Sequence, residues 1–302
     1  MTYQPRRQEA GGTMVRLGAN RYGKAEVRVV HVGRGTGPGG SDVIRDWNVS
    51  TALSGDLAAS HLTGDNSDVL TTDTQKNTVY AFASKLGGVE PEAFALELAA
   101  HYVSTQRAIS RARIVIQEYP WEPISASGHS FARAGQYTRM AAVVTDAELG
   151  SSVVGGIADL VVLNTTGSEF WGFPRDEYTT LADARDRVLA TTVTAQWRLR
   201  EPAADWAAVF DAARLALLDA FTRPSKSLQQ TLYGMGSAVL AAVPGLCEVR
   251  LALPNKHHFL VDLSPFGITN QNEVYHAADR PYGLIEGTVL ADDAPPAGLA
   301  WE

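Results

Sequence analysis

Four polar residues stand at the start of an apolar stretch, in the sequence LPNKHHFLVDL at residues 253–263. If these residues form a strand, Asn255 and His257 share one face, and Lys256 and His258 share the other. Two strand rises separate Asn255 from His257 by roughly 7 Å, which suits gripping one small ligand or water molecule between them. We therefore take Asn255 and His257 as candidate site residues. We expect Lys256 and His258 to be structural or interface residues.

Two other interpretations of this stretch compete with a ligand site. Pro254 and Asn255 could form a turn that leaves the histidines as interfacial polar groups, with Phe259–Leu263 buried in either case. A metal site could draw its ligands from His257, His258, His276 and Asp279. Adjacent histidines on a strand point to opposite faces, however, and no His-x-His or His-Glu-x-x-His spacing occurs. We therefore expect no metal.

Three aromatic residues, Phe170, Trp171 and Phe173, lie among glycines and charged residues in the segment TGSEFWGFPRDEYTTL, residues 166–181. Aromatic side chains beside glycine in a loop serve either as core residues or as a stacking surface for a planar ring.

Two arginines, Arg185 and Arg187, follow in DARDRVLAT. We expect them on a helix, where side chains two residues apart point in different directions, so that at most one faces a given site. That arginine would either pair with Asp183 or Asp186 at the surface or clamp an anion through its planar guanidinium.

Two segments fit capping boxes, Thr72–Gln75 as Thr-x-x-Gln and Ser227–Gln230 as Ser-x-x-Gln. Each predicts the start of a helix whose free main-chain N–H groups can bind an anion or a carbonyl oxygen. Each can equally be a plain cap that contributes ~1 kcal/mol of stability.

The elements that position these residues are predicted from the periodicity of apolar residues. Both halves of the chain repeat the order hairpin, helix, helix, strand, which indicates an α+β fold duplicated in tandem, with helices packed on one face of antiparallel sheets. We expect a disordered arm over residues 1–13, a first domain over 14–135 and a second over 136–302. Helices are expected at 72–86, 90–106, 205–223 and 227–243. Strands are expected at 25–32, 43–53, 107–121, 137–146, 151–167, 192–199, 246–253, 257–263 and 282–290.

Composition excludes several functional classes. The 302 residues carry a net charge of −7 and no long basic run, which argues against nucleic-acid binding. No apolar run approaches the length of a membrane span, and no apolar signal core follows the first residues. Cys247, the one cysteine, lies in apolar sequence and is expected to be buried and inert, in a reducing compartment such as the cytoplasm. Phosphate-binding loops, dinucleotide fingerprints and nucleophile elbows are also absent from the sequence.

Seven segments together resemble the urate oxidase (uricase) family, in the family's order and across both halves, from about residue 14 to residue 291. The stretch 107–135 matches more loosely. The seven segments are YGKAEVR, TTDTQKNTVYAF, TGSEFWGFPRDEYTTL, RVLAT, SLQQTLY, LPNKHHFLVDL and ADRPYGLIEGTV.

The resemblance implies two tandem tunnelling-fold (T-fold) domains, each with an antiparallel four-stranded sheet and two helices on one side. It also implies a cytoplasmic homotetramer around a tunnel, with active sites at subunit interfaces. The implied activity is an oxidoreductase of purine catabolism that converts urate, O2 and water to 5-hydroxyisourate and H2O2. It implies no metal and no organic cofactor, with O2 as co-substrate.

The same resemblance assigns roles to individual residues. Phe170 would stack on the purine, and Ile285 would line the floor of the site. Arg187, Gln229 and the main-chain N–H of Leu228 would hold the pyrimidine edge, while Thr72 and the main-chain N–H of Asp73 would hold the five-membered ring across the interface. Asn255 and Thr72 would hold dioxygen or the attacking water. A catalytic proton relay would consist of Lys24, Thr72 and His257.

Two alternatives belong to other functional classes. One is a metal- or pterin-type enzyme on the same fold, such as a cyclohydrolase-like protein, which would need a zinc-binding set of histidines and cysteines. The other is a non-catalytic purine-binding assembly, which would keep Phe170, Arg187 and Gln229 but lose the relay. Because the relay residues are present, the sequence favours catalysis.

Overall fold

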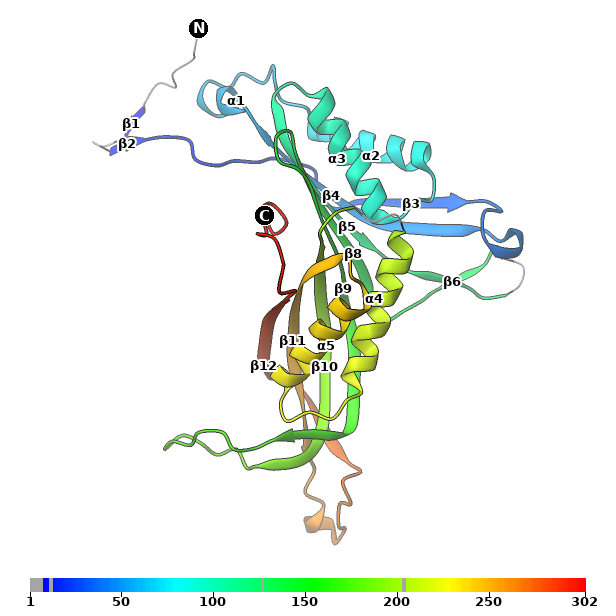
Figure 1. Cartoon of the computed structure of the whole chain (residues 1–302), viewed down its shortest axis with the longest axis vertical. Coiled ribbons are helices and arrows are strands. Elements are labelled where there is room, and N and C mark those ends of the chain that lie inside the picture. The colour runs from blue at the N-terminus through cyan, green and yellow to red at the C-terminus, as the bar shows by residue number, and fades with distance from the viewer. Residues whose placement is uncertain (1–7, 11–12, 126–127, 203–204) are drawn as a thin grey trace. The chain divides into compact units, whose positions relative to one another are not determined.

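The computed structural model describes residues 8–10, 13–125, 128–202 and 205–302, and its internal contacts divide the chain into two units. Unit 1 comprises Met1–Ala134, Met140–Val154 and Ala297–Glu302, and unit 2 comprises Gly135–Arg139 and Gly155–Pro296. The strands, labelled in Figure 1, are β1 (Gln8–Ala10), β2 (Thr13–Val15), β3 (Val27–Gly33), β4 (Val43–Gly55), β5 (Ile109–Glu118), β6 (Trp121–Pro123), β7 (Phe131–Arg133), β8 (Thr138–Asp146), β9 (Gly150–Phe170), β10 (Ala184–Leu199), β11 (Leu246–Leu260) and β12 (Tyr275–Leu290). The helices are α1 (Ala58–Leu62), α2 (Thr72–Leu86), α3 (Pro91–Thr105), α4 (Trp206–Phe221) and α5 (Leu228–Ala242), with 3-10 turns η1 (Pro38–Gly40) and η2 (Ser264–Phe266).

Unit 1 is a sheet with strand order β8-β5-β4-β3, covered on one face by helices α2 and α3 (Figure 1). Alternate residues of the strands, such as Leu53 and Ile114, are fully buried, and α3 packs on β5. Trp47 of β4 and Phe94 of α3 meet with ring centroids 4.7 Å apart. Pro91 occupies the first turn of α3, as the sequence predicts, because its missing N–H and fixed φ suit that position.

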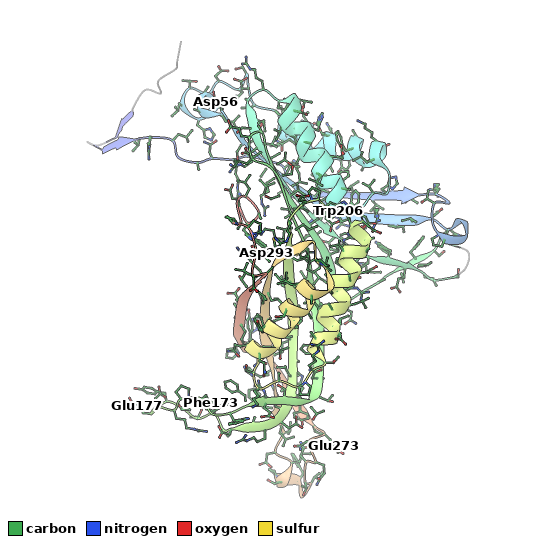
Figure 2. All side chains as sticks on the ribbon, viewed as in Figure 1. Asp56, Phe173, Glu177, Trp206, Glu273 and Asp293 are labelled. Atoms are coloured by element: carbon green, nitrogen blue, oxygen red, sulfur yellow. The ribbon has the colours of Figure 1, made fainter. Side chains whose placement is uncertain are left out.

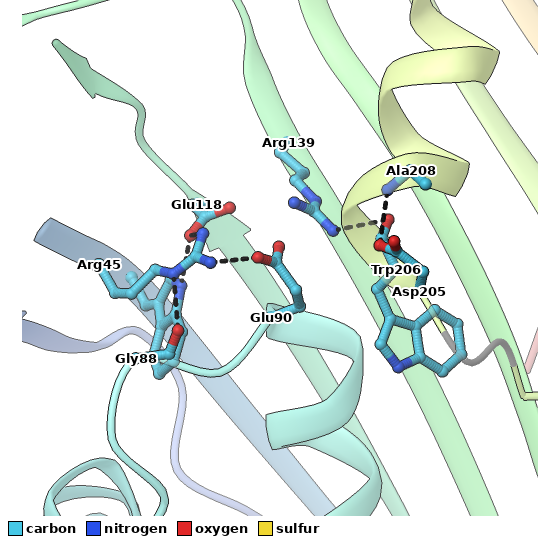
Figure 3. A network of polar contacts seen from close by, with 9 residues as sticks. Arg45, Gly88, Glu90, Glu118, Arg139, Asp205, Trp206 and Ala208 are labelled. Carbon is cyan, nitrogen blue, oxygen red and sulfur yellow. Dashed lines mark hydrogen bonds and ion pairs between the residues drawn. The ribbon is translucent and has the colours of Figure 1, made fainter. Parts of the chain in front are cut away.

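One arginine ties the start of α3 to this sheet (Figure 3). Arg45 donates from Nη1 to Glu118 at 3.0 Å and from Nε to the carbonyl oxygen of Gly88 at 3.2 Å, and it pairs with Glu90. Trp47 Nε1 also donates to Glu118, at 3.0 Å. Because the buried charges are paired and hydrogen-bonded, the network fixes the entry of α3 without leaving an isolated charge inside.

Unit 2 has the strand order β12-β11-β10-β9, with α4 and α5 packed together and α5 lying against β11 and β12 (Figure 1). Its core includes Trp197 of β10 and Phe210 of α4, with ring centroids 5.9 Å apart. Asp205 caps α4 by accepting from the N–H of Ala208 at 2.9 Å (Figure 3). Cys247 is free and fully buried, as predicted, and burial raises the pKa of its thiol.

Two connections of unit 2 extend beyond its strands (Figure 2). Phe173 and Glu177 lie along the segment that links β9 to β10, and Glu273 lies in the loop between β11 and β12. The aromatic segment around Phe170 is therefore at the base of an extension, next to the end of β9.

The four predicted helices are present, and the α+β class with antiparallel strands and packed helices is confirmed. The short helix α1 and the β6–β7 hairpin were not predicted from periodicity, because each is too short to establish one. In the described parts of the chain, no helix is long and apolar enough to cross a membrane. Of the expected disordered arm, residues 1–7 and 11–12 lie outside the described residues, whereas β1 pairs with β2.

Several strand predictions near the candidate site were wrong in their limits, among them the last strand, which begins at Tyr275 and not at residue 282. Strand β10 begins at Ala184, so the segment that carries Arg185 and Arg187 is a strand and not the expected helix. Strand β11 runs without a turn through Pro254, which lies opposite Leu284 of β12. Both extensions depend on pairing with neighbouring strands, which local periodicity does not reveal.

The predicted burial of Phe259–Leu263 was also wrong for the isolated chain. Strand β11 ends at Leu260, and the side chains of Phe259 and Leu260 are 56% and 48% exposed. Apolar side chains of this segment therefore lie on the surface of the protomer.

Candidate active site

An arginine and an aromatic ring form the centre of the candidate site in unit 2. Phe170 ends β9, and Arg187 lies near the start of β10 with its Cζ 5.3 Å from the centroid of the Phe170 ring. Because β10 is a strand, Arg185 and Arg187 share a face. Each covers its own aromatic residue, since Cζ of Arg185 is 3.7 Å from the Trp171 ring centroid. The prediction that at most one of the two arginines faces a site rested on helical geometry and does not apply.

The charge of Arg187 has no counterion in the described structure. Its Nε is buried and has no hydrogen-bond partner, and no carboxylate of a described residue pairs with it. Burial lowers the pKa of its guanidinium from the ordinary value. Burying an unpaired cation is costly, so this geometry favours an anionic group above Phe170.

The start of α5 is joined to the end of β9. Ser168 and Ser225 form a parallel bridge, in which the N–H of Glu169 donates to Ser225 at 2.8 Å and the N–H of Ser225 donates to Gly167 at 3.0 Å. Phe170 lies two residues after Ser168, and α5 begins three residues after Ser225. The bridge therefore fixes the main chain just before Phe170 relative to the main chain just before Leu228 and Gln229.

The predicted capping box at α5 is present with a shift of one residue. Ser227 Oγ accepts from the N–H of Gln230 at 3.1 Å, as expected. Gln230 in turn accepts from the N–H of Lys226, at 2.7 Å, and not from that of Ser227. The N–H groups of Leu228 and Gln229 lie in the first turn, where a helix has no internal acceptors for them.

Three further predicted residues lie on the two adjacent strands. Asn255 of β11 lies opposite Thr191 of β10 and opposite Gly283 of β12, and Ile285 of β12 lies opposite Leu253. The register of β11 on β12 is irregular between Asn255 and the candidate residue His257. That Asn255 and His257 share a face stays a prediction, because strict alternation does not hold across such an irregularity.

His258, the second histidine of the pair, contacts a main-chain oxygen close to it in sequence. His258 Nδ1 lies 3.0 Å from the carbonyl oxygen of Lys256. His257 instead stacks on Phe259, with ring centroids 5.7 Å apart. Among the described residues, no group of three or more His, Cys, Asp or Glu side chains is arranged to hold a metal ion.

Lys24, Thr72 and Asp73 belong to unit 1, where a chain of hydrogen bonds relates them. The main chain of Lys24 accepts from the N–H of Thr51 at 2.9 Å and donates to its Oγ1 at 3.1 Å. Thr51 Oγ1 donates to Gln75 Oε1 at 2.7 Å, and Gln75 is buried in the first turn of α2. The backbone of Lys24 is thus fixed relative to the first turn of α2, which carries Thr72 and Asp73.

The predicted cap of α2 was off by one residue. Thr71 is the N-cap and accepts from the N–H of Thr74 at 3.0 Å, so Thr72 is the first helical residue and its hydroxyl is not needed as the cap. The side chain of Asp73 accepts hydrogen bonds from Lys76 and Asn77, which follow it in the same helix. Hydrogen bonding to Lys76 is the main cause of the lowered pKa of Asp73. Only its main-chain N–H is left for a ligand, which is the group that the sequence analysis singled out.

Comparison with known proteins identifies the family of the chain. A family profile described as "Uricase" matches residues 20–144 and 153–286. The uricase of Arthrobacter globiformis is 49% identical over 292 residues, which cover 96% of this chain and 95% of that protein. The uricase of Dictyostelium discoideum is 38% identical, with 91% of this chain and 98% of that protein covered. The chain belongs to the uricase family.

Solved uricase structures agree with the fold described above. The crystal structure of the A. globiformis uricase has a TM-score of 0.91 at 46% identity, covering 96% of this chain and 99% of that one. That of a uricase from Bacillus fastidious has a TM-score of 0.77 at 26% identity, covering 90% and 93%. The antiparallel sheets with packed helices are the T-fold of these uricases.

Residue types alone did not indicate three residues that position the uricase-family motifs. Thr51 and Gln75 relate Lys24 to α2, and Asp186 accepts from Thr166 Oγ1 and from the N–H of Gly167, each at 2.8 Å. The sequence pattern indicates Gln75 only as part of a capping box. It indicates Asp186 only as an ion-pair partner for arginine, whereas Asp186 hydrogen-bonds to the chain just before Phe170.

Proposed function

We propose that the protein is a cofactor-independent urate oxidase, which converts urate, O2 and H2O to 5-hydroxyisourate and H2O2. The observation that carries the proposal is the Arg187 guanidinium over Phe170, partly buried and without a counterion among the described residues. Urate is a planar anion, so an aromatic surface and a bidentate donor match its shape and its charge together. The similarity of the chain to the uricases of A. globiformis and D. discoideum also supports the proposal.

The binding residues of unit 2 would hold the pyrimidine edge of urate. Phe170 stacks on the ring, Arg187 and Gln229 grip two adjacent polar atoms, and the main-chain N–H of Leu228 adds a third donor. Ile285 lines the floor. What supports these roles is the bridge between Ser168 and Ser225, which joins the main chain just before Phe170 to the main chain just before α5.

The proton relay would take Lys24 and Thr72 from unit 1 of one protomer and His257 from unit 2 of another protomer. Lys24 acts as the base through Thr72, and His257 completes the relay. The N–H of Asp73 and the hydroxyl of Thr72 bind the five-membered ring, and Asn255 with Thr72 holds dioxygen or the attacking water. Support comes from the Lys24–Thr51–Gln75 chain, because it sets the lysine beside the first turn of α2.

The proposal includes an assembly and a compartment. The protein would be a homotetramer of cytoplasmic subunits, each with T-fold domains at 14–135 and 136–302, and with active sites completed at subunit interfaces. The exposed apolar side chains of Phe259 and Leu260 support an assembly, since a monomer would leave them in water.

An absorbance assay with a chelator tests the proposal. The ultraviolet absorbance of urate is followed with the purified protein, in the presence of ethylenediaminetetraacetic acid, while peroxide is measured in parallel. We expect loss of urate with one peroxide formed per urate, unaffected by the chelator. A folded protein that leaves urate unchanged, or one whose activity the chelator removes, would contradict a cofactor-independent urate oxidase.

A further inference from the structure

Thr191 of β10 carries a buried hydroxyl that neither the sequence patterns nor the proposed function uses. The residue is 0% exposed, and its Oγ1 has no hydrogen-bond partner among the described residues. A hydroxyl that leaves water without gaining a partner lowers the stability of the folded protein, and a valine of the same shape would avoid that penalty. Buried polar groups are otherwise nearly always paired, so a threonine at this position calls for a functional explanation.

Thr191 lies on the face of the unit 2 sheet that packs on the helices. Alternation along β10 puts Val193 and Trp197 on the same face, and the ring of Trp197 meets that of Phe210 of α4. The neighbours of Thr191 on this face of the strand, Leu189 and Val193, are apolar and buried. A partner for the hydroxyl must therefore come from another element or from a bound molecule.

The residue directly opposite Thr191 on β11 is Asn255. Residues paired in this way share a face of the sheet, with their Cβ atoms about 5 Å apart. On its other side Asn255 lies opposite Gly283 of β12, which has no side chain. Of the two residues paired with Asn255, only Thr191 can therefore contact its amide with a side chain.

The amide of Asn255 needs an orienting partner if it is to donate to a ligand. An amide presents an oxygen that accepts and an NH2 group that donates, so its orientation decides which of the two faces a bound molecule. In the described parts of the chain the partly buried side chain of Asn255 forms no hydrogen bond. A hydroxyl that donates to the amide oxygen leaves the NH2 group to point elsewhere. Thr191 and Asn255 are thus two polar side chains, paired across two strands, that each have an unused hydrogen-bonding group.

We propose that Thr191 is a positioning residue for Asn255. In the ligand-bound protein the hydroxyl of Thr191 donates to Oδ1 of Asn255, and the NH2 group of the amide is thereby directed at dioxygen or the attacking water. The inference rests on the proposed function, in which Asn255 binds the oxygen species. Because Phe170 and Arg187 hold urate in that function, the contribution of Thr191 falls on the reaction with O2 and not on the binding of urate.

Steady-state kinetics at varied O2 and at varied urate test the proposal. Thr191→Val keeps the shape of the side chain and removes the hydroxyl. It should lower kcat/KM for O2 by roughly 3- to 10-fold, the effect of losing one hydrogen bond, with little change in KM for urate. Thr191→Ser restores the hydroxyl and should recover most of the loss. The urea midpoint of Thr191→Val should not fall, because a buried hydroxyl without a partner is replaced by a methyl group.

Two further variants separate positioning from a general effect on the strand. Thr192 follows on β10, on the opposite face, and its Oγ1 is also buried without a partner in the part of the chain that the structure describes. Thr192→Val is therefore the matched control and should leave kcat/KM for O2 unchanged. Asn255→Ala removes the group that Thr191 orients, so adding Thr191→Val to Asn255→Ala should have no further effect.

The possible failures are distinguishable. Unchanged kcat/KM for O2 in Thr191→Val, in a parent protein that oxidises urate, would overturn this inference and leave the proposed function standing. So would a loss that Thr191→Ser does not recover, an equal loss in Thr192→Val, or a further loss on top of Asn255→Ala. A folded parent protein that does not oxidise urate would overturn the proposed function, and this inference with it.

Discussion

The residues that we propose for urate binding and for proton transfer differ in their surroundings in the structure. Arg187 is half-buried against an aromatic ring with its Nε unpaired, as a binding group for a planar anion should be. The main chain of Lys24 is held by Thr51, and the charge of its side chain contributes to the lowered pKa of Asp73. No hydrogen bond or ion pair of its ammonium group is formed within the described part of the chain, and we propose that this group acts in the relay.

Substitution of Lys24 should therefore affect turnover more than binding. Lys24→Met is expected to lower kcat on the order of 100-fold while changing KM for urate little, because it removes a proton acceptor that acts in the reaction. Steady-state kinetics on urate would measure both. A Lys24→Met protein with unchanged kcat would refute the relay.

Substitution of Arg187 should have the opposite effect. Arg187→Ala is expected to raise KM for urate by roughly 10- to 100-fold, because a charge-assisted bidentate contact is lost. Arg187→Lys is the matched control and should recover only part of the affinity, since lysine lacks the planar fork. If both variants bound urate as well as the parent, Arg187 would not be the clamp.

The single cysteine offers a prediction about the core. Cys247 is fully buried, and its thiol pKa is raised by that burial, so the reactive thiolate is scarce and reagents are excluded. Iodoacetamide should modify the native protein on the order of 100-fold more slowly than the denatured protein, with one label per chain in denaturant. Mass spectrometry would count the labels, and rapid native labelling would show that β11 opens readily.

At the scale of elements, local sequence was sufficient for helices and insufficient for strands. The four long helices were predicted because their periodicity and caps are local, as Ser227 at α5 illustrates. The early start of β10 and the continuity of β11 through Pro254 were missed, because strand pairing, unlike a helix cap, is not a local property of the sequence. The same holds for the site. Residue types singled out Arg187, but only the fold shows that it lacks a counterion among the residues that the structure describes.

Two adjacent threonines in the first turn of α2 are expected to have separate roles, Thr71 in stability and Thr72 in catalysis. Thr71 caps the helix, so Thr71→Ala should lower the free energy of unfolding by ~1 kcal/mol while leaving kcat nearly unchanged. Thr72→Ala is the matched variant and should reduce kcat strongly with a stability change within about 0.5 kcal/mol. Urea midpoints at fixed protein concentration, together with urate kinetics, distinguish the two. A reversed pattern would move the proposed ligand contact from Thr72 to Thr71.

At the scale of the whole molecule, the edges of the sheets predict association. Strand β3 is the last strand in the order of unit 1 and β12 the last in that of unit 2, so each has one side without a partner strand among the described residues. Unpaired strand edges and exposed apolar side chains such as Phe259 are liabilities for a monomer. In an assembly, other copies of the chain would pair with these strand edges and bury these apolar side chains.

Light scattering after gel filtration should therefore give a particle of about four times the 32.4 kDa chain mass. Phe259→Asp is expected to shift the population toward smaller species and to lower activity in parallel, because the proposed sites need residues from two protomers. Leu149→Asp, at an exposed apolar residue in the turn between β8 and β9, serves as the comparison. A fully active monomer would refute both the assembly and the shared site.

The uninterrupted strand β11 constrains how this protein can change by recombination. Its residues run from the buried Cys247 to the proposed site residue Asn255 between β10 and β12, and the register on β12 becomes irregular only between Asn255 and His257. Gaining or losing one residue before Asn255 would exchange inside and outside for the residues that lie between the change and that irregularity. Chimeras with other uricases should therefore exchange β11 as one block, with crossover points before Leu246 or in the loop after Leu260. Within the block, sequence can diverge by substitution but not by insertion.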